Sequence, residues 1–600
     1  MYFVLGTTAH AAGEFNTDFE VTYTLRENGI TEVKNKITLT NIFSNLYATS
    51  YSVVLSGVSP KNIISYGSDG ASYIVNTKQD EGQTNINIDF PDTVVGKGNS
   101  RTFYLTYDES SFAVKTGEVW EVTIPKIGDE NAFSSYFVNL IVPKNLGQEA
   151  YISPSPRSTD HNESHFVYRF TKDDVKTSGV VAGFGQFQVF SFTLNYHLEN
   201  PLSKTAQTEI TLPPDTSYQK MYYTNLNPRP NSMYVDRDGN WIANYALKPR
   251  ERVDVIASGQ VQIFASVRPF PKPSEETLKD NLKPNTYWEV DDPNIKNLAN
   301  NLKTPKAIYD YVSTTLKYDY GRVKPNVERL GASRALNAPN SAICMEFTDL
   351  FVAIARAAGI PAREVNGYAY TENPEIQPLS LVNDVLHAWP EYYDYKKNAW
   401  IPVDPTWAST TGGIDYFSKL DLRHFTFVIH GVDSVRPYPA GSYKLGINPQ
   451  KDIFVSFGSL PQERNTKLQA TAYLESWIPL VANRMDLEIT NPGPSAYYDV
   501  LPKIYFDKNE VKYDKTIETL LPFQTHETYI EIPFSFLGTK TPEIVRVLIN
   551  GQDLEVKTGK TQVIVYNLIF IFLLAIVFLV TILIRLGKIS FRWKFPKKNS

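Results

Sequence analysis

The chain has 600 residues, 42% of them hydrophobic and 20% charged, and at about 150 residues per domain this length corresponds to roughly four domains. Such a composition excludes a wholly disordered, collagen-like or coiled-coil protein, because apolar residues are ample for packed cores. The net charge of -5 argues against nucleic acid as a partner, since phosphate binding needs a basic face. The single cysteine, Cys344, excludes an intramolecular disulfide and a metal site built from several thiolates.

The N-terminal residues 1–13 include Ala9-His10-Ala11, a small-x-small arrangement typical of a signal-peptidase site. The apolar run before it is short and carries no basic residue. We therefore interpret residues 1–13 as the end of a signal peptide that begins upstream of the recorded start. The alternative is a tail-anchored protein with its body in the cytoplasm.

Residues 14–190 and 191–268 show short runs of alternating apolar residues separated by turn residues, a pattern that predicts two β-rich, sandwich-like units. Asn28-Gly29 lies between two such runs and predicts a hairpin. The segment 236–240, Asp-Arg-Asp-Gly-Asn, resembles the start of a calcium loop. It lacks the glutamate expected at the twelfth position, so a hairpin turn is favoured.

Prolines at 269, 271 and 273 predict a linker, and residues 274–440 then read as an α+β unit. Thr304 followed by Pro305 is a helix start, and residues 344–358 form a second helix whose apolar side chains share one face. Gly359-Ile360-Pro361 ends this helix. Strands are expected at 363–369, 386–395 and 399–403, followed by a polar stretch to about residue 439.

The C-terminal part begins with an alternating pattern that predicts one more, Ig-like β-sandwich over residues 465–558. Residues 561–584 contain no charge and are long enough to cross about 30 Å of hydrocarbon, which predicts a transmembrane helix. The tail 585–600 carries six basic residues and no acid. By the positive-inside rule this tail is cytoplasmic, and the body of this single-pass protein faces outward from the cell membrane.

Three residues of the α+β unit form a candidate thiol site: Cys344, His387 and Asp404. A cysteine at a helix start is favoured as a thiolate. Reflection of the chain through a turn near residue 395 places His387 opposite Asp404 on two strands of one hairpin, so that the carboxylate could hold one imidazole nitrogen while the other faces the sulfur. Nucleophile, base and orienting acid are what thiol catalysis requires. Each residue also has a structural interpretation: Cys344 as a small core residue, His387 as a core histidine and Asp404 as a turn residue.

The sequence around these residues resembles the transglutaminase-like superfamily. Three blocks carry the resemblance, in the family order: Ser341-Ala-Ile-Cys-Met-Glu-Phe347 with the helix ending Gly359-Ile-Pro-Ala-Arg363, then His387-Ala-Trp-Pro-Glu-Tyr392, then Trp400-Ile-Pro-Val-Asp-Pro-Thr-Trp407. The resemblance covers roughly residues 304–439 and implies a papain-like fold in which Cys344, His387 and Asp404 are catalytic. Animal members carry an upstream tryptophan that stabilises the oxyanion, whereas residues 331–343 here contain no aromatic side chain. The backbone N–H of Cys344 is one candidate oxyanion donor, and a second is not identifiable from sequence.

Two hypotheses follow. In the first, the chain is an outward-facing enzyme that acts on amide bonds of proteins or peptides through an acyl-thioester, which water or an amine then resolves. In the second, the transglutaminase-like unit is a silent scaffold and the β-units bind or assemble partners. No cofactor and no metal are expected, and the sequence leaves the oligomeric state open. His424 and His430 have no carboxylate at ligand spacing, so we interpret them as structural.

Overall fold

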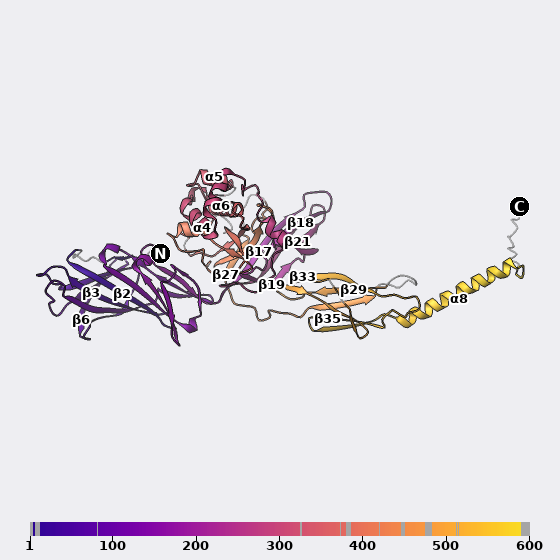
Figure 1. Cartoon of the computed structure of the whole chain (residues 1–600), viewed down its shortest axis with the longest axis horizontal. Helices are drawn as coiled ribbons and strands as arrows, with labels where there is room; N and C mark the ends of the chain where they lie inside the picture. The colour runs from indigo at the N-terminus through magenta and orange to yellow at the C-terminus, as the bar shows by residue number, and fades with distance from the viewer. Residues whose placement is uncertain are drawn as a thin grey trace. The chain divides into compact units, whose positions relative to one another are not determined.

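The computed structural model describes residues 4–6 and 13–589, apart from 81, 325–326, 373, 380–385, 419, 446–450, 475–482, 512 and 514. The chain separates into two compact units, Met1–Pro461 and Gln462–Ser600. Strands predominate in both units, while helices gather in one part of the first unit and at the C-terminal end of the chain (Figure 1). The protein is therefore multidomain and mostly β, as the alternating sequence predicts.

The N-terminal region contains a 12-stranded sheet and a four-stranded sheet around one apolar core. The predicted Asn28-Gly29 hairpin is confirmed, because β2 (Phe15–Leu25) and β3 (Thr31–Asn41) pair antiparallel across that turn, with Gly29 at a positive φ of 83°. Most of the expected signal remnant, residues 1–13, lies outside the described residues. The remaining strands are β1 (Val4–Gly6), β4 (Ser50–Ser56), β5 (Lys61–Gly67), β6 (Ser72–Asp80), β7 (Gln83–Asp89), β8 (Ser100–Glu109), β9 (Ala113–Thr116), β10 (Val119–Ile124), β11 (Lys126–Ile127), β12 (Ser135–Pro143), β13 (Glu149–Ser153), β14 (Ser158–His161), β15 (His165–Thr171) and β16 (Val180–Phe184); the short helices are η1 (Glu130–Ala132), η2 (Lys144–Leu146) and α1 (Lys172–Val175).

The next region has two smaller sheets, in the orders β19-β22-β17-β27 and β18-β21-β20. The expected boundary at residue 190 falls inside β17 (Phe187–Glu199), which is continuous because it pairs with β22 along its whole length. The turn at 236–240 joins β20 and β21 antiparallel, which confirms the hairpin. The other strands are β18 (Ala206–Leu212), β19 (Gln219–Asn227), β20 (Ser232–Val235), β21 (Trp241–Leu247), β22 (Arg252–Phe264) and β27 (Ile453–Phe457).

The helices of the first unit surround α6 (Cys344–Ala357), whose apolar side chains are buried against α3, α4, α5 and the sheet that follows. Full burial of each large apolar side chain contributes about 1.5–3 kcal/mol, so this helix is held mainly by packing. The Thr304 cap is confirmed, since its hydroxyl accepts the N–H of Ala307 at 3.2 Å. The helices are α2 (Glu275–Asp280), α3 (Pro293–Leu302), α4 (Pro305–Thr315), η3 (Tyr320–Arg322), α5 (Ala332–Asn337), α6 and α7 (Pro405–Thr410).

The sheet beside α6 has the order β25-β24-β23-β26. Three of its strands confirm the sequence prediction to within a residue or two: β23 (Ala362–Ala369), β24 (His387–Asp394) and β25 (Ala399–Pro402). The expected polar stretch to residue 439 is wrong in part, because β26 (His424–His430) lies within it and is buried along its whole length. Strand β26 pairs with β23, so this segment completes the core sheet.

The second unit has three small sheets around a core that includes Met485, Leu487 and Ile489, alternate residues of β29. The alternating pattern expected within 465–558 does form strands, and β29 (Asn483–Thr490) pairs antiparallel with β34 (Thr525–Ile532). The strands are β28 (Gln469–Leu474), β29 (Asn483–Thr490), β30 (Tyr497–Val500), β31 (Lys503–Phe506), β32 (Asn509–Val511), β33 (Ile517–Leu520), β34 (Thr525–Ile532), β35 (Ile544–Ile549) and β36 (Gln552–Lys557).

The chain continues into α8 (Lys560–Arg585), drawn in yellow in Figure 1. Its 26 residues have a mean hydropathy of 3.1 over the most apolar window, and only 6% of that window is buried. Length and composition make α8 a candidate membrane span, one residue longer at each end than the predicted 561–584. This helix is consistent with a single-pass membrane anchor.

Candidate active site

Cys344 is the first residue of α6, and its side chain is fully buried. The first turn of α6 leaves backbone N–H groups without an intrahelical partner beside this side chain, at the positive end of the helix dipole. Glu346 brings a negative charge into the same turn, but Arg322 pairs with it at 3.1 Å and offsets that charge. The Glu346 carboxylate also accepts the N–H of Ile343 at 2.9 Å, which fixes the backbone just before the cysteine. The predicted helix start at Cys344 is confirmed.

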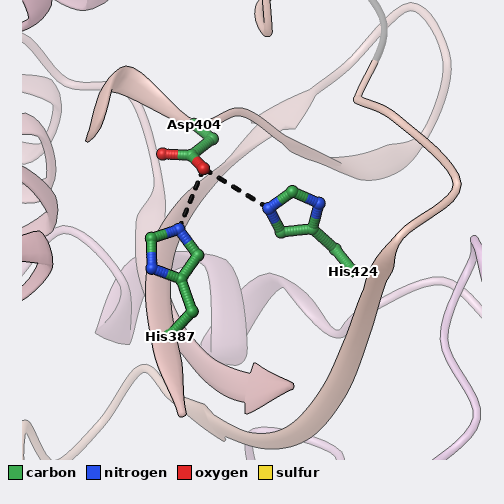
Figure 2. A group of neighbouring side chains, drawn as sticks. All are labelled: His387, Asp404 and His424. Atoms are coloured by element: carbon green, nitrogen blue, oxygen red, sulfur yellow. Dashed lines mark hydrogen bonds and ion pairs between the residues drawn. The ribbon is translucent and has the colours of Figure 1, made fainter. Parts of the chain in front are cut away.

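His387 begins β24, where it lies opposite Gly367 of β23. Its imidazole is fully buried, and Nε2 lies 2.9 Å from Oδ2 of Asp404 (Figure 2). Nδ1 is also buried and has no hydrogen-bond partner among the described residues. Cys344 interacts with the same imidazole and contributes to its raised pKa.

Asp404 reaches His387 by a different route from the one expected. The hairpin turns one residue later than predicted, with Asp394 opposite Ala399, and β25 ends at Pro402, so Asp404 is not a cross-strand neighbour of His387. It is instead the N-cap of α7, where Oδ1 accepts the N–H groups of Thr406 at 2.9 Å and Trp407 at 3.0 Å. Pro405 fits the first helical position and starts that helix. The cap leaves Oδ2 free to face the imidazole.

The charges of this group reinforce one another. Burial by itself lowers the pKa of His387, but the Asp404 carboxylate outweighs burial and, with Cys344, raises that pKa to about 9. Burial acts on Asp404 in the opposite sense and raises its pKa, yet His387 and His424 hold the pKa well below its usual range. Asp404 is therefore ionised at neutral pH, and His387 readily holds a proton.

For His424, the expectation that no carboxylate lies nearby is wrong. It is buried in β26, where Nε2 lies 3.3 Å from Oδ2 of Asp404 and Nδ1 lies 2.6 Å from Oδ1 of Asp421. The sequence signal was Asp421, three residues earlier, before a run of strand-forming residues. His430 lies elsewhere, with Nε2 2.8 Å from the carbonyl oxygen of Pro437 and Nδ1 3.9 Å from Glu364. The structural interpretation of His430 stays a prediction that these contacts fit.

Aromatic rings wall this group off from water. Trp407 stacks on His387 at 5.2 Å between ring centroids, and Trp389 packs edge-on against His424 at 4.9 Å. Ligand atoms of His387, Asp404 and His424 lie within 4.8 Å of one another, a spacing that a metal ion also uses. Both imidazoles already direct a nitrogen at the same carboxylate oxygen (Figure 2), so hydrogen bonding accounts for the spacing.

Tyr318 lies close to the cysteine through backbone pairing. It forms a parallel bridge with Ala342, and the N–H of Asp319 donates to the Ala342 carbonyl at 2.8 Å. Burial, and after it the charge of Cys344, raise the pKa of Tyr318 far above its usual value, so the hydroxyl stays protonated. In the part of the chain that the structure describes, this buried hydroxyl has no partner. The sequence search covered residues 331–343 and missed Tyr318, because only the fold brings residue 318 alongside residue 342.

The geometry agrees with comparisons to known proteins. Residues 291–405 match the model of the transglutaminase-like superfamily, a range that includes Cys344, His387 and Asp404. A protein-glutamine gamma-glutamyltransferase of Pseudomonas aeruginosa is 27% identical over 184 residues, which are 28% of this chain and 26% of that protein. The chain thus spans about a quarter of the length of this curated relative.

Solved structures are similar at a lower level. A proposed cysteine protease from Cytophaga hutchinsonii is 15% identical, with a TM-score of 0.27, over 46% of this chain and 99% of that one. An M1 zinc metallopeptidase from Deinococcus radiodurans is 9% identical, with a TM-score of 0.19, over 33% of this chain and 45% of that one. These TM-scores are too low to bear on activity, and the family assignment depends on the sequence match. Residues 291–405 of this chain are a domain of the transglutaminase-like superfamily.

Proposed function

We propose that the chain is a membrane-anchored thiol enzyme that acts on amide bonds of proteins or peptides, with Cys344 as nucleophile, His387 as base and Asp404 as the acid that orients the base. The observation that carries this proposal is that Asp404 binds Nε2 of the His387 ring, while Nδ1 is buried and Cys344 interacts with the same imidazole. This arrangement of the imidazole is what a catalytic base requires, and a protein that serves only as a scaffold does not require it.

The proposed reaction begins when His387 takes the proton of Cys344 and the thiolate attacks the amide carbonyl carbon. The carbonyl oxygen becomes an oxyanion, which the N–H of Cys344 stabilises and for which the unpartnered Tyr318 hydroxyl supplies a second donor. Collapse of this intermediate breaks the C–N bond, and the amine leaves with the proton from His387. Water then hydrolyses the acyl-thioester, or a primary amine accepts the acyl group.

Access to the sulfur is restricted, because Cys344 and His387 are both fully buried. A carbonyl group reaches the sulfur only after neighbouring side chains move. Once it is inside, the aromatic walls exclude water, which strengthens the electrostatic interactions and favours transfer to an amine over hydrolysis. The similarity to a gamma-glutamyltransferase also supports transfer to an amine over hydrolysis.

The test uses the only cysteine of the chain as a reporter. The full chain in detergent is alkylated with iodoacetamide between pH 5 and 9, beside a His387→Ala variant. A thiolate–imidazolium pair gives a rate that is nearly constant from pH 6 to 8, whereas an ordinary thiol loses about tenfold per pH unit below its pKa. Slow access lowers both curves without changing their slopes. An ordinary slope in the unmodified chain excludes the activated thiolate and favours the alternative, a silent binding or assembly protein.

A second experiment separates hydrolysis from transfer. The full chain and its Cys344→Ala variant are mixed with a glutamine-containing peptide, with and without a primary amine, and the products are analysed by mass spectrometry. We expect a thioester adduct on Cys344 and an amine-linked peptide, neither of which forms with the variant. Release of a glutamate-containing peptide alone identifies a hydrolase, and an unchanged peptide contradicts the proposed reaction.

The proposed orientation places the body outside the cell membrane and the tail in the cytoplasm, because basic residues cluster after α8. Protease added to intact cells that express the full chain should then digest the body and leave α8 with the tail. A body that is cut only after the membrane is opened supports the tail-anchored arrangement instead.

A further inference from the structure

The Asp404 carboxylate receives four donors, and they divide between its two oxygens. Oδ1 accepts the N–H groups of Thr406 and Trp407, and Oδ2 faces Nε2 of His387 at 2.9 Å and Nε2 of His424 at 3.3 Å. The backbone donors locate one oxygen only. The position of the oxygen that binds His387 therefore depends on His424 as well.

His424 is itself held from its other side. Asp421, just before β26, accepts from Nδ1 at 2.6 Å and from the N–H of Arg423 at 3.1 Å. Ionised carboxylates accept hydrogen bonds and do not donate them. An imidazole between Asp421 and Asp404 therefore needs a proton on each nitrogen, which makes it a cation. Consistently, although burial alone lowers the pKa of His424, the two carboxylates raise it to about 9.

We propose, as an extension that rests on the proposed function, that Asp421 and His424 are a positioning pair which holds the second oxygen of Asp404 toward His387. The chain of contacts then runs from Asp421 through His424, Asp404 and His387 to Cys344, with anion and cation alternating along it. In this arrangement His424 touches neither substrate nor sulfur. It acts through Asp404 by fixing where the negative charge sits.

A cavity beside this pair makes the inference testable. It has a volume of about 420 Å³, and both Asp421 and His424 line it together with Trp389, Ile401 and Phe264. Cys344, His387 and Asp404 are not among its lining residues. A small molecule can therefore enter next to His424 without contacting the proposed catalytic residues. Shortening His424 extends the cavity toward Asp404 by the volume of one imidazole ring.

Other charged groups lie near His424, and two of them are held in ion pairs. On the β24 side, Glu391 binds Arg363 at 2.7 Å, and on the β26 side, Arg423 forms an ion pair with Glu121. His387 lies 5.7 Å away between ring centroids, and Lys397 lines the cavity. Both His424→Ala and His424→Gln remove the His424 charge, so an effect of charge alone on the acid limb of the alkylation profile is the same in the two variants, whereas only His424→Ala loses the hydrogen bond to Asp404. Loss of positioning moves the acid limb to higher pH, because Asp404 then stabilises the imidazolium less well.

The experiment measures iodoacetamide alkylation of Cys344 against pH in His424→Ala, His424→Gln and His430→Gln variants of the full chain. We expect His424→Ala to move the acid limb of the profile to higher pH by about one pH unit, which makes alkylation at pH 6 about tenfold slower. This is the effect expected from the loss of one charge-assisted hydrogen bond. Gln keeps an N–H donor for Asp404 and should restore most of the rate. His430→Gln, in the same strand but bonded to Pro437, should leave the profile unchanged.

Rescue separates a positioning role from loss of folding. Imidazole added at tens of millimolar should enter the enlarged cavity and restore the rate of His424→Ala but not that of His387→Ala, and it should not alter the rate of His430→Gln. A profile for His424→Ala that is unchanged, or moved to lower pH, overturns the positioning role. An ordinary thiol slope in the unmodified chain removes the proposed function itself, so the two failures are distinguishable.

Discussion

Replacement of Asp404 by asparagine separates its two tasks. Asparagine caps helices about as well as aspartate does, so its side-chain oxygen can still accept the N–H groups of Thr406 and Trp407 and keep α7 intact. The other position becomes an NH₂ group, which donates where His387 needs an acceptor. The substitution therefore removes the charge that orients the imidazole without removing the local fold.

The magnitude follows from the pKa of His387, which stands at about 9 against an ordinary 6.5. A difference of about 2.5 pKa units corresponds to about 3 kcal/mol, and Asp404 is the largest of the groups that raise the pKa. Loss of most of this stabilisation should lower the thiolate fraction at pH 6 by about 100-fold. Alkylation of Cys344 should slow by the same factor, and the plateau between pH 6 and 8 should become a slope.

The assay is the alkylation rate of the full chain in detergent, with circular dichroism and a thermal melt as folding controls. The reasoning is refuted if Asp404→Asn keeps both the wild-type melting temperature and the wild-type pH profile. A variant that unfolds is not informative about charge, and in that case Asp404→Glu provides the comparison, since it keeps the charge and moves the oxygen.

Further expectations concern stability and insertion. His387 and His424 have folded pKa values near 9, above the ordinary 6.5, so the stability they contribute is fully present below about pH 6.5. At about 3 kcal/mol for each residue, chemical denaturation should show a decline on the order of 6 kcal/mol as pH rises through 9, and a flat curve contradicts the paired state. In Gly367→Ala the new Cβ would lie 2.1 Å from the carbonyl oxygen of Phe425, so thermal melts should show a loss of about 1–3 kcal/mol, and an unchanged melting temperature contradicts the tight packing of β23 on β26. Leu574→Arg in α8 should cost about 3 kcal/mol of membrane insertion and reduce the fraction recovered in carbonate-washed membranes, whereas unaltered recovery argues against a span.

Local patterns in the sequence were enough to predict the elements around the site. The helix that starts at Cys344 follows from apolar spacing and from the glycine and proline after it. The strand that begins at His387, and the hairpin that joins it to the strand starting at residue 399, follow from the alternating pattern and the turn residues. These features depend on contacts within a few residues of one another, and for that reason a single sequence contains them.

Contacts between distant segments were decided by the tertiary structure. The sequence placed Asp404 on a strand, whereas the end of β25 and the start of α7 make it a helix cap. His424 looked isolated because Asp404 is twenty residues away along the chain, and Tyr318 looked unrelated to Cys344 because 26 residues separate them. A buried carboxylate needs several donors, and the fold collects them from whichever segments pack together. The place of the single cysteine at a helix start thus follows from local sequence, while the hydrogen-bond network around His387 exists only in the folded chain.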